Sequence, residues 1–137
     1  MSVEVVILVG SPGVGKTWVS DQLKEMFHVV EHDDFKSKSG YIFELSRAAR
    51  SGTKKILGNT PFGLQEIMHE LESKNLKVRP VFIIEKPDVL TARYEADRGK
   101  KIPPGHLTRQ NTYKARAKEL SAFCGTSDEV LKHLMEK

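Results

Sequence analysis

Residues 10–17 of the chain read Gly10-Ser11-Pro12-Gly13-Val14-Gly15-Lys16-Thr17 and match the pattern G-x-x-x-x-G-K-[ST] at every position. The preceding residues 3–9 are a nearly unbroken run of apolar, mostly β-branched side chains, which predicts a strand buried on both faces. In residues 15–27 the apolar side chains recur at helical spacing. A strand, a glycine-rich turn and a helix in this order are typical of a phosphate-binding loop.

The residues of this loop have separate expected roles. The three glycines allow backbone N–H groups to surround the oxygens of a phosphate. Lys16 is expected to reach the β- and γ-phosphates, and the Thr17 hydroxyl is expected to bind Mg²⁺. We therefore expect ATP and Mg²⁺ as cofactors, with nucleotide contacts from residues 10–17 and from the adjoining Trp18.

The order of the predicted elements indicates the fold class. Strands are expected near residues 3–9, 28–31, 54–57 and 78–84. Helices are expected near 15–27, 36–50, 61–74, from 87 onward, 106–123 and 127–136, with Pro61 in a first turn. Strands that alternate with helices predict an α/β protein with a mainly parallel sheet of about four strands flanked by helices. A length of 137 residues with 39% apolar residues predicts one folded domain, residues 1–137, and argues against disorder.

The loop after the second predicted strand carries two adjacent acids, Asp33 and Asp34. In an open α/β sheet this loop lies at the carboxyl edge of the strands, beside the bound γ-phosphate. A carboxylate there can accept the proton of an attacking hydroxyl group. The alternatives are that one acid faces the acceptor while the other caps the next helix, or that both are caps or surface acids.

A basic segment, residues 98–105, predicts a lid. Charge that develops during phosphoryl transfer is stabilised by arginine, and the candidates are Arg93, Arg98 and Arg109. Glycine and proline residues around Lys100 and Lys101 would allow the segment to close over the nucleotide. Helical spacing places Arg109, Tyr113 and Arg116 on one face, although packing of Tyr113 against the sheet is an alternative.

The charge distribution bears on the acceptor. The chain has a net charge of +4, but residues 36–55 carry +5 and residues 93–118 carry +6. Concentrated positive charge attracts polyanions, and the alternative is a pair of solvated helix faces.

Several of these segments resemble a known family. Residues 10–18, 32–36, 93–103 and 107–113 are similar to the kinase domain of phage polynucleotide kinases and of related small phage P-loop kinases, including those that phosphorylate hydroxymethyluracil in DNA. The resemblance covers essentially the whole chain. It implies that Asp33 is the general base, that Lys36 contacts the phosphate of the acceptor, and that Arg98 contacts the phosphates of the nucleotide.

The chain also departs from that family in two places. Gly58-Asn59-Thr60 replaces the family's Asp-Thr-Asn, so metal binding would rest on Thr17, and residues 58–62 would form an acceptor-specific loop. Arg93 is one residue out of register with the second lid arginine of the family.

The leading prediction is an ATP-dependent kinase that acts on a hydroxyl of nucleic acid, DNA in preference to RNA, either at a 5′ end or on a base hydroxymethyl group. The catalytic residues would be Lys16, Asp33 and Arg98. Acceptor contacts would come from Asp33, Asp34, Lys36, Asn59, Thr60, Arg109 and Tyr113.

The alternatives are a kinase for a nucleoside, nucleotide or other metabolite, and a nucleotide-gated binding module without transferase activity. No apolar run suits a membrane span, so we expect no membrane partner and a cytoplasmic location, that of the host if the chain is phage-encoded.

Overall fold

The computed structural model describes residues 3–11, 13–52, 54–60 and 63–136. Its centre is a five-stranded sheet in the order β2-β3-β1-β4-β5, and all its strand pairs are parallel. The strands are β1 (Val5–Val9), β2 (Phe27–Val30), β3 (Lys55–Thr60), β4 (Val78–Ile83) and β5 (Phe123–Gly125). The helices are α1 (Lys16–Gln22), the 3₁₀ helix η1 (His32–Asp34), α2 (Lys38–Ser51), α3 (Leu64–Ser73), α4 (Pro87–Arg98), α5 (Pro104–Glu119) and α6 (Ser127–Met135). The predicted α/β class with a parallel sheet is confirmed.

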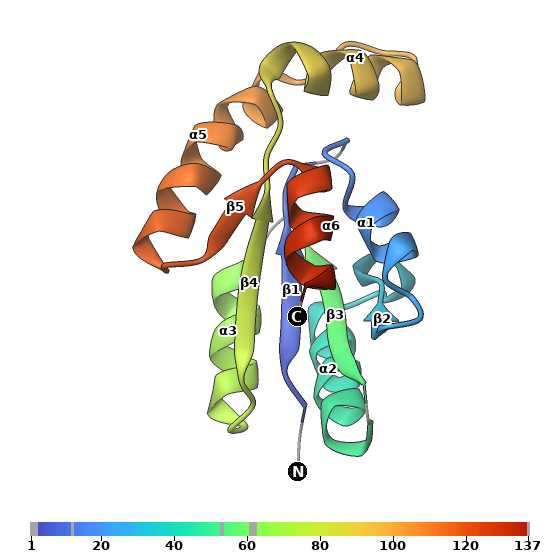
Figure 1. The fold of residues 1–137 in the computed structure, drawn as a ribbon, viewed down its shortest axis with the longest axis vertical. Helices are drawn as coiled ribbons and strands as arrows, with labels where there is room; N and C mark the ends of the chain where they lie inside the picture. The colour runs from blue at the N-terminus through green and yellow to red at the C-terminus, as the bar shows by residue number, and fades with distance from the viewer. Residues whose placement is uncertain (1–2, 12, 53, 61–62, 137) are drawn as a thin grey trace.

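The central strand β1 explains how the layers are held together. Successive side chains of a strand point to opposite faces of the sheet. Val5, Ile7 and Val9 therefore join a core with α2 and α3, whereas Val6 and Leu8 join a second core with α1 and α6. All five residues of β1 are buried, because helices cover both faces (Figure 1).

The carboxyl ends of the strands carry the loops that matter for function. The loop after β1 lies at this edge, and α4 crosses above it before the chain turns into α5 (Figure 1). The segment expected to form the lid is thus divided. Its first residue, Arg98, ends α4, residues 99–103 form the connection, and Pro104 begins α5.

Several predicted boundaries are wrong. The sheet has a fifth strand, β5, in a segment predicted to end a helix at 123; the helix ends at Glu119, and Ser121 then adopts a positive φ of 52°. The third strand was predicted to end at residue 57 but continues to Thr60, so residues 58–60 are buried strand rather than an acceptor loop. Helix α1 ends five residues early. Pro61 and Phe62 lie outside the described residues.

In the part of the chain that is described, no helix combines the length and the apolar character that a membrane crossing requires.

Candidate active site

The phosphate-binding loop has the local geometry that its sequence predicts. Gly15 precedes α1 with a φ of 105°, a left-handed conformation that glycine adopts without strain. The Lys16 side chain folds back and its Nζ donates to the carbonyl of Gly10. Burial lowers the pKa of Lys16 to about 8; nearby Asp33 opposes this shift, and Arg98 adds to it. A partly buried ammonium group of this kind is suited to receive a phosphate.

A cavity of about 720 Å³, which we call the donor cavity, opens at this loop. Its lining comes from the first turn of α6, from residues at the carboxyl ends of β2 and β3, and from α4, which crosses above the phosphate-binding loop (Figure 1). Its lining residues are Ser11, Gly13, Gly15, Lys16, Thr17, Trp18, Glu31, His32, Asp33, Asn59, Arg93, Asp97, Arg98, Ser127 and Asp128. The structure therefore brings Trp18, Asp33, Asn59 and both predicted lid arginines of α4 together with the loop residues Ser11, Gly13, Gly15, Lys16 and Thr17. The predicted loop contacts Gly10 and Val14 do not line the cavity, because Val14 packs in the core between α1 and α6. Pro12 lies outside the described residues.

Asn59 joins the end of β3 to the turn after β2 at the wall of this cavity. Its side-chain oxygen accepts a 3.0 Å hydrogen bond from the backbone of His32, and its Nδ2 donates to the carboxylate of Glu31. Glu31 was not predicted as a site residue. The available signal was its position directly after β2, where a side chain reaches the carboxyl edge of the sheet.

The backbone of Asn59 is held by Tyr41. Strand β2 ends at Val30, which pairs with Gly58, so Asn59 has no partner in that strand. The buried Tyr41 hydroxyl takes the place of the missing strand: it donates to the Asn59 carbonyl over 2.9 Å and accepts from the Asn59 N–H over 2.8 Å. Burial raises the pKa of Tyr41. Gly58 permits this approach, because a Cβ at that position would lie 2.5 Å from the hydroxyl.

The two adjacent aspartates occupy different surroundings. The Asp33 side chain is 99% exposed, lines the donor cavity and lies 3.8 Å from Nδ1 of His32. Asp34 is exposed and does not line the donor cavity, and the same holds for Lys36. The backbone of a 3₁₀ turn directs adjacent side chains apart, which accounts for the separation of the pair.

The two arginines of α4 are held differently. Arg93 forms a 3.2 Å ion pair with the buried carboxylate of Glu85. The guanidinium of Arg98 stacks over the ring of Tyr94, 4.8 Å from its centroid. Arg98 is exposed, so its charge is available to a ligand in the donor cavity.

Gln110 is a buried polar residue of α5 that sequence reasoning missed. Its Nε2 donates to Oγ of Ser11 over 3.2 Å and to the carbonyl of His106 over 2.8 Å. Its Oε1 accepts from the backbone N–H of Glu85 over 3.1 Å. This one side chain joins the phosphate-binding loop, α5 and the segment before α4. Polar residues on a helix are common, and no local pattern distinguishes this one.

Other predicted acceptor residues lie elsewhere. Arg109 and Tyr113, together with Arg116, line a second cavity of about 770 Å³ between α3 and α5. Their predicted sharing of one helix face is confirmed. Thr60 is fully buried at the end of β3 and lines none of the cavities.

The described residues contain no group of three or more His, Cys, Asp or Glu side chains arranged to hold a metal. Thr17 is exposed and lines the donor cavity beside Lys16. These residues fit a Mg²⁺ ion that is bound chiefly by nucleotide phosphates, with Thr17 as a protein ligand.

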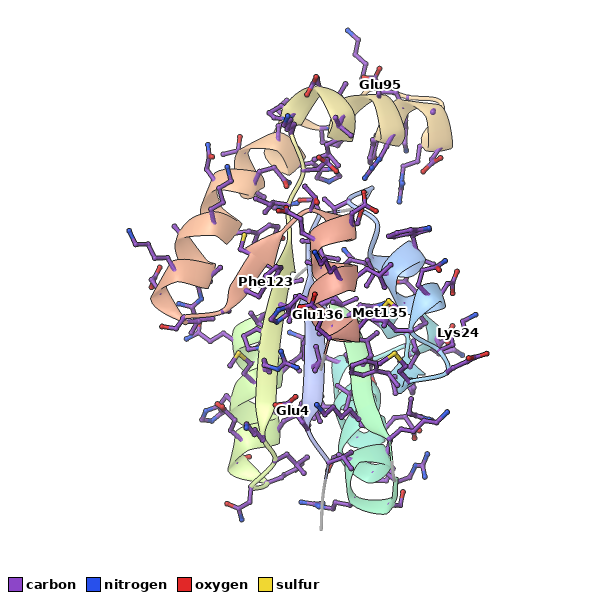
Figure 2. All side chains as sticks on the ribbon, viewed as in Figure 1. Glu4, Lys24, Glu95, Phe123, Met135 and Glu136 are labelled. Atoms are coloured by element: carbon purple, nitrogen blue, oxygen red, sulfur yellow. The ribbon has the colours of Figure 1, made fainter. Side chains whose placement is uncertain are left out.

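Several cations of the first basic stretch, residues 36–55, are paired with acids. Lys38 lies 2.8 Å from Glu66, and Arg47 Nε donates to Glu44 over 2.8 Å. Lys55 lies 4.0 Å from Glu4, which Figure 2 places at the end of the sheet opposite α4.

Comparisons with known proteins are consistent with this geometry. No family model matches the chain, and the search of curated proteins found no match. A gluconokinase from Sinorhizobium meliloti 1021 superposes with a TM-score of 0.64 at 15% identity, over 96% of this chain and 88% of that one. The tunicamycin resistance protein of Deinococcus radiodurans gives 0.67 at 17% identity, over 96% and 92%. The shikimate kinase of Bacteroides thetaiotaomicron gives 0.55 at 14% identity, over 97% and 96%.

At these identities the likeness establishes the fold. The chain has the P-loop NTPase fold, similar to the fold of these solved structures. The particular resemblance to phage polynucleotide kinases stays a prediction.

Proposed function

We propose that the protein is an ATP-dependent phosphotransferase that moves the γ-phosphate to a hydroxyl group of a small molecule. The observation that carries this proposal is the composition of the donor cavity. Its lining includes Lys16 of the phosphate-binding loop, the carboxylates of Glu31 and Asp33 from the turn after β2, and the guanidinium of Arg98 at the end of α4. A cation for the phosphates and a base for a hydroxyl group therefore share one enclosure.

The residues have the following roles in this proposal. The acceptor oxygen forms a bond to the γ-phosphorus while the bond from that phosphorus to the β,γ-bridging oxygen breaks, and ADP leaves. Asp33 accepts the proton of the hydroxyl group, and Asn59 holds Glu31 beside it. Lys16 and Arg98 stabilise charge on the phosphoryl oxygens. Mg²⁺, when bound through Thr17 and the phosphates, would neutralise further negative charge.

Two observations support a small acceptor. The solved structures reported above include kinases named for gluconate and shikimate, which are small molecules. The cations of residues 36–55 are also partly paired with acids, and Lys38 begins α2 while Arg50 lies near its other end. At 1.5 Å per residue, these two cations are separated by roughly 18 Å along the helix. A nucleic-acid acceptor remains the second candidate, because α4, which lines the donor cavity, and α5, which lines the second cavity, contain most of the second basic stretch.

The test is transfer from γ-labelled ATP to a panel of acceptors. The panel contains sugar acids, neutral polyols, nucleosides, 5′-hydroxyl DNA and RNA, and hydroxymethyluracil DNA with blocked ends. We expect label on a small molecule with the wild type and none with Lys16→Ala. Label only on an oligonucleotide would favour the second candidate. Specific nucleotide binding without transfer to any acceptor would instead support a binding module.

A further inference from the structure

The second cavity has the properties of a ligand site. Its volume of about 770 Å³ is similar to that of the donor cavity. Its apolar lining comes from the ends of β1 and β4, through Val9 and Phe82, and from Ile42 and Leu64. An apolar floor with a few convergent polar groups is the usual construction of a small-molecule site.

The two walls of this cavity differ in charge. Helix α5 contributes Arg109 and Arg116, which are seven residues apart and therefore lie on one face. Helix α3 contributes Glu66, His69 and Glu70. Lys38 pairs with Glu66 over 2.8 Å and offsets its charge. One wall is thus cationic, and the other offers groups that hydrogen-bond to hydroxyls.

The second cavity also adjoins the donor cavity. Val9 directly precedes the phosphate-binding loop. On α5, Gln110 follows Arg109 of the second cavity and donates to Oγ of Ser11, which lines the donor cavity. On the other side, Asn59 of the donor cavity and Gly63 of the second cavity lie four residues apart in the chain. A ligand in the second cavity would therefore lie next to the transferred phosphate.

We infer that the second cavity binds the phosphoryl acceptor and that this acceptor is a small hydroxylated acid. Its carboxylate or phosphate group faces Arg109 and Arg116, because a guanidinium binds such groups through paired hydrogen bonds. Hydroxyl groups that do not react face His69 and Glu70, while the reacting hydroxyl extends toward Asp33 and the γ-phosphate in the donor cavity. This inference rests on the proposed function and specifies the class of its substrate.

Binding is measured by calorimetry with saturating Mg·ADP, so that the phosphate-binding loop is already filled. The probes are D-gluconate, its 6-phosphate, glycerate, and D-sorbitol as the uncharged polyol. We expect at least one acid to bind at least about 10-fold more tightly than sorbitol, a difference of about 1.4 kcal/mol. The 6-phosphate separates recognition of a phosphate from recognition of a carboxylate.

Arg109→Gln and Arg116→Gln are each expected to weaken binding of that acid about 10-fold or more, the cost of a lost charged hydrogen bond. Lys118→Gln removes an exposed cation of the same helix that lines neither cavity, and it should change nothing. If Arg109→Gln unfolds the protein, Arg116→Gln still tests the inference. Arg116 is only half-buried, and its 3.5 Å ion pair is with the exposed Glu119 at the end of α5, so its loss should not unfold the chain. Equal binding of acids and sorbitol, or equal loss with Lys118→Gln, would overturn the inference.

The two proposals fail separately. If an acid binds and the binding depends on the arginines, but no label is transferred to any acceptor, the proposed phosphotransferase activity is refuted and the proposed acid site is retained. Label on an acceptor whose KM is unchanged by both arginine substitutions would leave the phosphotransferase and refute the acid site.

Discussion

The side-chain amide of Gln110 donates a 3.2 Å hydrogen bond to the hydroxyl of Ser11, across a sequence separation of 99 residues. Both side chains are buried, at 4% and 0% exposure. Because Gln110 also binds the backbone of Glu85, the phosphate-binding loop and the base of α4 are positioned by one amide. The side chain of the same Glu85 forms an ion pair with Arg93 of α4. Gln110 is therefore connected through Glu85 to the helix that lies over the donor cavity.

Replacing this amide tests whether it positions the loop. Gln110→Leu removes one hydrogen bond from the Ser11 hydroxyl and leaves the backbone N–H of Glu85 without its side-chain acceptor, which costs about 1–3 kcal/mol. We expect a lower melting temperature and, at a temperature where the variant is folded, a fall in kcat that exceeds any change in the KM for acceptor. Asn111→Leu alters an exposed neighbour on the same helix and should leave both unchanged. A kcat equal to wild type in folded Gln110→Leu would exclude the positioning role.

Tyr41→Phe tests the support of Asn59. The substitution removes one hydroxyl that satisfies both the N–H and the carbonyl of Asn59. The free energy of unfolding should fall by about 1–3 kcal/mol, as for a buried group left unpaired. Chemical denaturation measures it. Phe43→Leu, on the exposed side of the same helix, should cost less than about 0.5 kcal/mol. Equal values for the two variants would mean that the hydroxyl contributes nothing.

The choice of general base is testable by two matched substitutions. Asp33→Asn keeps the shape of the side chain and removes its basicity, so we expect kcat to fall by about 10²- to 10⁴-fold, while the affinity for ATP changes little. Asp34→Asn lies outside the donor cavity and should retain activity. Steady-state kinetics distinguish the two. If Glu31→Gln shows the large loss instead and Asp33→Asn does not, Glu31 is the base.

The lowered pKa of Lys16, about 8, predicts pH-dependent nucleotide binding. Below this pKa the side chain is an ammonium ion and attracts phosphate; above it the free protein must take up a proton to regain that charge. The affinity for ATP should therefore fall as the pH rises from 7 to 9.5, with proton uptake near pH 8.

Calorimetry in buffers of different ionisation enthalpy measures that proton uptake directly. Lys16→Arg carries a charge that does not titrate in this range, so its affinity should be flat. The same slope in Lys16→Arg would assign the titration to another group.

Much of the fold could be predicted from the sequence, because the motif and the hydrophobic patterns that indicate it lie in short, continuous segments. The motif at residues 10–17 requires a strand before it and a helix after it, and the alternation of strands and helices predicts a parallel sheet. Strand β5 escaped prediction because three residues, Phe123–Gly125, carry too little periodicity to be distinguished from a helix end. The end of β3 escaped because Gly58 and Asn59 are poor strand formers. They are strand here because both pair with β1, and Tyr41 gives Asn59 the hydrogen bonds that β2, which ends at Val30, does not supply.

The sequence by itself determined the phosphate-binding loop, since its chemistry resides in the backbone of eight consecutive residues. Only the tertiary structure decided which distant side chains face that loop. It selected Asp33 over Asp34 for the donor cavity, added Glu31 through Asn59, and placed Arg109 and Tyr113 in a separate cavity. Such groupings depend on where strand ends and helix faces meet in space, and no spacing along the chain encodes that meeting.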